Sequence, residues 1–137
     1  MKRLFAIIAA VFAITLLGAP QQTTANETTS TQSPRILSSA YYSGIIGKNL
    51  GVTVYLEHYT NGEYYGWYYY NKNGSNNKLR LEGRKCVDGT VELVEYTSNG
   101  QVTAAFAGTF NNYGQFIGTM YVGHSDKYYS CKLTPIR

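Results

Sequence analysis

The stretch that decides the fold is residues 62–74, which read Gly-Glu-Tyr-Tyr-Gly-Trp-Tyr-Tyr-Tyr-Asn-Lys-Asn-Gly. Six of these thirteen residues are aromatic, and a glycine closes each end. Aromatic side chains favour β-strands, and glycine beside asparagine favours turns. Successive side chains of a strand point to opposite faces, so only one aromatic set can enter a core. The stretch therefore predicts a strand that carries rings on both faces.

Strand-like runs recur along the chain, and turn signals such as Asn-Gly and Asp-Gly separate them. These dipeptides tolerate the positive φ that tight hairpins require. The runs cover residues 41–46, 51–58, 64–70, 78–85, 90–96, 102–110, 115–122 and 127–133. Eight consecutive runs joined by hairpins predict an all-β fold, a single small eight-stranded antiparallel up-and-down meander barrel. A two-sheet β-sandwich is the alternative.

The start of the chain has the layout of a secretory signal peptide. Lys2 and Arg3 precede an apolar run over residues 4–17, and small residues up to Ala25 offer a cleavage site. The apolar run is shorter than the ~20 residues that span a bilayer, so we expect no stable membrane insertion after cleavage. Residues 1–25 are therefore predicted to be a signal peptide, with an uncleaved anchor as the alternative. The mature protein would be periplasmic or extracellular.

Residues 26–39 are rich in Thr, Ser and Gln and show no hydrophobic period. We interpret them as a flexible leader, followed by the β-barrel domain over residues 40–137. Without Lys2 and Arg3, ten basic residues face eight acidic ones, a net charge of +2. This charge is small and dispersed, so nucleic acid is not an expected partner.

Two cysteines, Cys86 and Cys131, remain in the predicted domain. An exported chain meets an oxidising compartment, so we expect a disulfide between them, with two buried free thiols as the alternative. Their spacing fits neither a metal site nor a redox pair.

The sequence shows no set of residues typical of catalysis. His58 and His124 are the only histidines, and neither has metal-binding spacing. A nucleophile elbow and a phosphate-binding loop are both missing from the sequence. We therefore expect no enzyme activity, no metal and no cofactor.

One carboxylate, Glu95, follows the inward register of Val91 and Leu93. It would point into a possible lumen with Tyr68 and Phe106, where tyrosine hydroxyls of the third run could pair with it. The alternative, a strand-end glutamate in solvent, is favoured because charged residues are rarely buried. Glycines within runs permit sharp bending or leave room for a ring, and we expect side chains rather than a ligand to fill the lumen.

A second set of rings falls on the face opposite the apolar register. Contiguous exposed rings mark interaction sites, and Tyr and Trp are frequent in protein interfaces. These residues are Tyr55, Tyr65, Trp67, Tyr69 and Tyr121. They predict a binding protein that docks a protein partner in an inhibitor- or immunity-like role. The alternatives are a carrier or binder of a small apolar ligand or glycan, and a purely structural aromatic ladder.

The packing positions also carry a resemblance. The motifs are Tyr42-x-Gly44-x-Ile46, Val52-x-Val54-x-Leu56, Gly66-x-Tyr68-x-Tyr70, Leu79-x-Leu81-x-Gly83, Phe106-x-Gly108-x-Phe110 and Gly118-Thr119-Met120. Together they resemble a pattern in small exported bacterial proteins of Bacteroidetes type, in which the last motif more often reads Gly-Thr-Trp. The resemblance implies the fold and the export route. The hairpin rhythm is also similar to avidin-like and lipocalin-like barrels.

Overall fold

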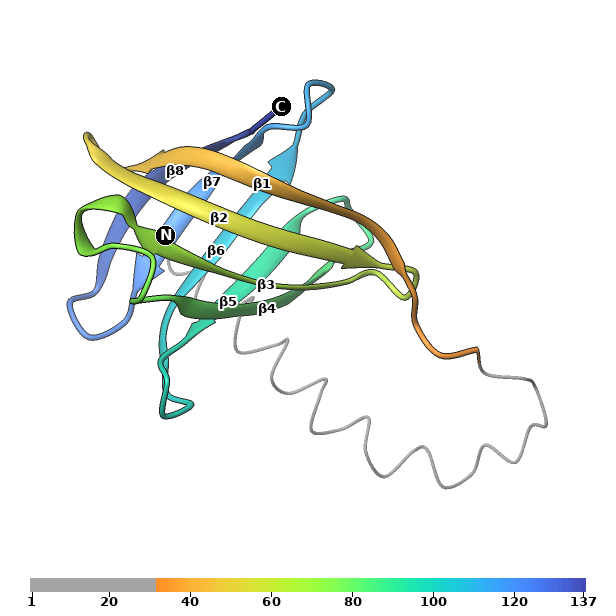
Figure 1. Cartoon of the computed structure of the whole chain (residues 1–137), viewed down its shortest axis with the longest axis horizontal. Helices are drawn as coiled ribbons and strands as arrows, with labels where there is room; N and C mark the ends of the chain where they lie inside the picture. The colour runs from red at the N-terminus through yellow and green to blue at the C-terminus, as the bar shows by residue number, and fades with distance from the viewer. Residues whose placement is uncertain (1–31) are drawn as a thin grey trace. The chain divides into compact units, whose positions relative to one another are not determined.

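The computed structural model describes residues 32–137, which form a closed β-barrel (Figure 1). The strands are β1 (Ile36–Ile46), β2 (Leu50–Tyr59), β3 (Glu63–Tyr70), β4 (Leu79–Lys85), β5 (Val91–Tyr96), β6 (Val102–Phe110), β7 (Phe116–Val122) and β8 (Lys127–Pro135). A single 3-10 turn, η2 (Asn71–Asn73), follows β3. Each strand pairs antiparallel with its neighbours in the chain, and β8 returns to β1. The structure confirms the predicted up-and-down barrel and excludes the sandwich.

The expected signal peptide, residues 1–25, lies outside the described residues, as does the leader up to residue 31. Within residues 32–137, no helix has the length and apolarity needed to cross a bilayer.

β1 begins at Ile36, four residues before the domain boundary expected at residue 40. Its first half pairs with β2 alone, because β8 pairs with β1 only from Tyr42 onward. Side chains there stay in solvent on both faces, and Ile36 and Leu37 are 51% and 62% exposed. Since neither face is buried, this part of the strand lacks the alternation that marks a strand in sequence.

The inward faces of the strands form one apolar core. Val52, Val54 and Leu56 from β2 enter it together with Tyr68 from β3 and Phe106 from β6. The void at its centre measures only about 10 Å³. Side chains therefore fill the centre of the barrel, as expected for a small barrel.

Two core glycines lie where neighbouring strands approach closely. A Cβ on Gly66 would lie 1.9 Å from the carbonyl oxygen of Tyr55, and one on Gly83 would lie 1.8 Å from that of Glu92. Real side chains cannot occupy such positions, so these glycines let the neighbouring strand approach closely. At both positions a Cβ would meet backbone atoms of the next strand and not an opposite ring.

Candidate binding surface

A row of aromatic and basic side chains crosses the outside of five neighbouring strands. The pairing places its members directly opposite one another from β1 to β5. The members are Tyr41, Tyr55, Trp67, Arg80 and Tyr96, and we call them the outer row. They share the outer face because their strand neighbours, such as Tyr42, Val54 and Tyr68, fill the core.

The rings of the outer row contact one another across the strands. Ring centroids lie 4.9 Å apart for Tyr41 and Tyr55, and 5.6 Å apart for Tyr55 and Trp67. Tyr69, two residues along β3, continues the stack at 6.1 Å from Trp67 with an interplanar angle of 17°. These separations fall in the range where aromatic pairs attract. Tyr41, Tyr55, Trp67 and Tyr69 therefore form one continuous aromatic surface.

Two cations lie over rings at the β4 side of this surface. The Nζ atom of Lys78 lies 4.2 Å from the ring centroid of Trp67, and the Cζ atom of Arg80 lies 4.3 Å from that of Tyr96. Both distances are typical of cation–π contacts. Tyr55 reaches Trp67 from β2, and Lys78 reaches it from the loop just before β4. The indole ring is therefore engaged from two sides.

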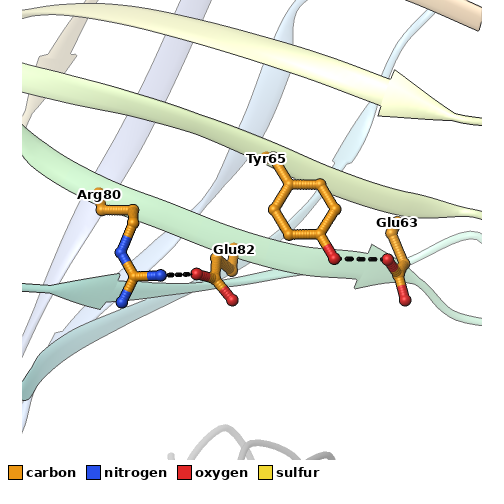
Figure 2. A network of polar contacts seen from close by, with 4 residues as sticks. All are labelled: Glu63, Tyr65, Arg80 and Glu82. Carbon is orange, nitrogen blue, oxygen red and sulfur yellow. Dashed lines mark hydrogen bonds and ion pairs between the residues drawn. The ribbon is translucent and has the colours of Figure 1, made fainter. Parts of the chain in front are cut away.

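Tyr65 lies beside the outer row, nearer the β2–β3 turn, and is 38% exposed. Its hydroxyl donates a hydrogen bond of 2.6 Å to Oε2 of Glu63 (Figure 2). This bond raises the pKa of Tyr65 to about 12, because ionisation would place two negative charges side by side. The ring of Tyr65 also meets that of Tyr59 edge-on at 5.3 Å.

Carboxylates around the aromatic surface are already paired. Glu57 accepts hydrogen bonds of 2.8 Å from the hydroxyls of Tyr55 and Tyr59, one on each carboxylate oxygen. Glu82 forms an ion pair with Arg80, which Figure 2 shows on the outside of β4. These bonds hold the hydroxyls and the guanidinium in place, so the surface is preorganised.

The structure brings four of the five expected binding residues together and leaves one apart. Tyr55, Trp67, Tyr69 and Tyr65 all lie on the outside of β2 and β3. Tyr121 lies on β7, four strands from β3 in a ring of eight. There it contacts Tyr128 at 4.8 Å and donates a hydrogen bond to Asp126. Tyr121 is therefore not part of the surface formed by the outer row.

Glu95 is buried inside the barrel, so the favoured alternative of a solvent-exposed glutamate is wrong. Only 6% of the residue is exposed. Its carboxylate accepts hydrogen bonds from the hydroxyls of Tyr68 and Thr103, and these bonds offset the cost of burying a charge. The ring of Tyr68 meets Phe106 edge-on at 5.6 Å. Burial and the nearby carboxylate raise the pKa of Tyr68.

The expected disulfide does not form, and both cysteines are free thiols. Cys131 is buried on the inner face of β8, whereas Cys86 follows β4 in the turn that leads to β5. β4 and β8 are four strands apart in a ring of eight, so the two cysteines lie on opposite sides of the barrel. The Cys86 thiol instead donates a hydrogen bond of 3.1 Å to Oε1 of Glu92.

The two histidines occupy a strand end and a turn. The ring of His58 stacks on Tyr64 at 4.3 Å, and burial, together with the charge of Lys85, lowers the pKa of His58. His124 is exposed in the turn between β7 and β8. Among residues 32–137, no three His, Cys, Asp or Glu side chains gather closely enough to hold a metal ion.

Sequence reasoning missed Tyr41, Lys78, Arg80 and Tyr96 as members of this surface. Tyr41 and Arg80 alternate with core residues, so continuing the strand pairing through the hairpins would have aligned them with Trp67. Tyr96 is harder to place, because the pairing of β5 with β6 shifts by one residue between Glu95 and Tyr96. The cation over Trp67 depends on the loop before β4, for which the sequence carries no pattern.

No protein-family model matches the chain, and no curated protein or solved structure is significantly similar to it. Its function is therefore inferred from its own residues and their arrangement.

Proposed function

We propose that this protein is an exported, non-catalytic binding protein that docks a protein partner through the outer row together with Tyr65 and Tyr69. One observation carries the proposal: five side chains, four of them aromatic, align across five strands on the outside of a closed barrel. Tyr41 is 51% exposed, and Tyr65 is 38% exposed. Interfaces are enriched in Tyr, Trp and Arg, the residue types of this row.

A protein partner suits the ring arrangement better than a glycan does. A sugar stacks on the open face of a ring, but Tyr55 of β2 and Lys78 of the loop before β4 already contact Trp67. The face of Tyr96 lies under Arg80. A flat sugar ring therefore competes with side chains already placed over Trp67 and Tyr96, whereas a protein surface can also pack against ring edges.

A carrier role finds no ligand-sized space at the centre of the barrel, and the cavity at the barrel end lined by Tyr42, Leu56 and Tyr64 measures about 150 Å³. The void at the centre of the described barrel is about 10 Å³, close to the least volume that holds one water molecule. Tyr68, which lines this void, contacts both Glu95 and Phe106. Pockets that hold small ligands are commonly 300–1,000 Å³.

An inhibitor- or immunity-like role fits a small, rigid module of this kind. The barrel is closed by eight strand pairs, so the outer row needs no folding step on binding. A preformed surface loses little entropy on association, and inhibitors benefit from this property. The apolar run at residues 4–17 supports export, and the proposed partner would therefore be an envelope or extracellular protein.

The test is capture of partners from an envelope extract of the producing cells, with the tagged protein and two variants. Trp67→Ala removes the centre of the outer row and Tyr41→Ala removes its exposed end. The matched control is Tyr113→Ala, because Tyr113 is a 76% exposed aromatic residue in the turn between β6 and β7. We expect the wild type and the control to recover the same partner, and the two row variants to lose it.

Equal recovery by all four proteins would contradict this use of the outer row. Urea unfolding of each variant checks that any loss of capture does not arise from a loss of folding. Binding of the wild type to arrayed neutral glycans, abolished by Trp67→Ala, would favour the glycan alternative instead.

A further inference from the structure

An open groove adjoins the outer row where β4 begins and β5 ends. Its volume is about 340 Å³, and its walls come from the start of β4, the end of β5 and the β5–β6 turn. The lining residues are Lys78, Arg80, Tyr96, Thr97, Ser98 and Gly100. Two of these six side chains are cationic, and no acidic residue lines the groove.

The two cations of the groove are held in place but keep donors for another molecule. Lys78 lies over Trp67 and has no carboxylate within ion-pair distance among residues 32–137. Arg80 lies over Tyr96 and pairs with Glu82 alone. Stacking on a ring uses the flat face of a guanidinium and leaves its N–H edge available for carboxylates. One acidic residue therefore balances two cations, and the groove carries a net positive charge.

We propose that this groove binds carboxylate side chains of an acidic segment on the protein partner. The inference rests on the proposed function and names the chemistry that the partner presents beside the outer row. Lys78 and Arg80 supply charge-assisted hydrogen bonds, which are stronger than neutral ones. The exposed Ser98 adds a hydroxyl donor on the opposite wall.

Charge complementarity alone would also suit an acidic polysaccharide, but the rings favour a peptide. A uronic acid residue would place its ring on Trp67 or Tyr96, and the cations already cover both. An aspartate or glutamate side chain needs only a cation to pair with, because it has no ring that must stack. The groove therefore fits single carboxylates on a flexible chain better than carboxylates on a sugar ring.

The test measures binding of fluorescein-labelled hexaglutamate to the full chain by fluorescence anisotropy. The groove variant carries Lys78→Gln and Arg80→Gln. The matched control carries Lys127→Gln and Lys132→Gln, two exposed lysines of β8, four strands away from β4. Both double variants lose the same charge. We expect the dissociation constant of the groove variant to rise at least tenfold, which corresponds to about 1.4 kcal/mol. The dissociation constant of the control should change less than about threefold.

Three outcomes would overturn the inference. The first is no saturable binding of hexaglutamate to the wild type. The second is an equal loss in the two double variants, which would indicate general attraction to a basic protein. The third is tighter binding of oligogalacturonate than of hexaglutamate, which would indicate an acidic sugar. Folding of the groove variant is checked by its urea midpoint, and Lys78→Arg with Arg80→Lys should restore most of the affinity.

Failure of this inference can be separated from failure of the proposed function. If the groove variant still captures the protein partner while Trp67→Ala and Tyr41→Ala do not, the rings of the outer row dock the partner without the charges of Lys78 and Arg80. If hexaglutamate binds the groove as expected but no row variant loses the partner, the proposed function fails and the groove remains an acidic-peptide site.

Discussion

A single buried carboxylate shows how the core of this barrel tolerates a polar group. Glu95 enters an apolar interior, where an unpaired charge would be costly. Tyr68 and Thr103 each donate a hydroxyl hydrogen to it, one to each carboxylate oxygen. Tyr68 itself is held by its edge-on contact with Phe106. Glu95 therefore depends on Tyr68 and Thr103, and Tyr68 on Phe106. Removing the hydroxyl of Tyr68 changes the shape of this group least, because the ring stays.

We expect Tyr68→Phe to destabilise the fold by about 1–3 kcal/mol, because Glu95 then loses a buried hydrogen-bond donor while the ring still fills its space. The free energy of unfolding in urea provides the measurement. Tyr113→Phe is the control, since Tyr113 is exposed in a turn and should change stability by less than about 0.5 kcal/mol. Equal stability of the two variants would show that the Tyr68 hydroxyl is not needed by Glu95.

The free cysteines allow a chemical prediction with a defined pH dependence. Burial, together with Glu92, raises the pKa of Cys86 to about 11, and burial raises that of Cys131 to about 12. At pH 8 only about one Cys86 thiol in a thousand would then be ionised, and thiolate is the reactive form. We expect slow reaction with a thiol reagent in the native state, about tenfold faster for each pH unit up to the pKa.

In denaturant both thiols should react rapidly and in a ratio of two per chain. An intact mass two hydrogens lower than the reduced chain, with no reactive thiol after unfolding, would show that the two cysteines pair after all. The alanine variant of Cys86 separates the two native reaction rates, because it leaves only the more deeply buried Cys131.

At the scale of the strand, the close approach of β2 and β3 depends on Gly66, which has no Cβ. We expect Gly66→Ala to destabilise the fold by about 1–3 kcal/mol, since its Cβ would lie 1.9 Å from the Tyr55 carbonyl oxygen and β2 and β3 would have to separate. Gly123→Ala is the matched control, because the nearest atom to its Cβ is 3.9 Å away. Urea unfolding measures both, and a Gly66→Ala protein as stable as the control would show that the close approach of β2 to Gly66 does not contribute to stability.

The strands were predictable because their physical causes are local. Alternation and turn residues located all eight, and the predicted run over residues 102–110 matches β6 at both ends. The start of β1 was not predictable, because residues 36–39 are exposed on both faces and carry no alternation. Their strand conformation comes from pairing with β2, which is a long-range interaction that local sequence does not encode.

The candidate surface was predictable only in part, for the same reason. The alternation within β3 placed Trp67 and Tyr69 outside, and that of β2 placed Tyr55 beside them. The pairing of β8 with β1 closes the barrel, and only this closure determines which strands lie on opposite sides. Tyr121 was grouped with the rings of β3, and Cys86 was paired with Cys131, although each pair of strands lies on opposite sides of the barrel. An outward side chain or an even cysteine count does not tell how far apart two strands lie. Glu95 was misjudged because the general rarity of buried charges was given more weight than a possible hydroxyl partner on the third run, and only the fold brings Tyr68 within bonding distance.

For the molecule as a whole, closure makes the inner and outer surfaces parts of one cooperative unit. Adjacent residues of β3 serve both surfaces, since Trp67 lies in the outer row and Tyr68 lies in the core. The seam between β1 and β8 completes the ring, and there Gly44 is paired with Leu133. The outer row therefore cannot stay formed once the core unfolds. A substitution that weakens packing at the seam should destabilise all eight strands together.

We therefore expect one urea transition, with the fluorescence of the single tryptophan, Trp67, coinciding with far-UV circular dichroism. Leu133→Ala should move both curves together to lower urea and cost about 2–5 kcal/mol, because Leu133 is buried at the seam. Lys132→Ala, its exposed neighbour on β8, should leave both curves within about 0.5 kcal/mol of the wild type. If Trp67 fluorescence changed before the dichroism, the outer row would be able to rearrange while the core stays folded. The preorganised surface on which the docking proposal depends would then be lost.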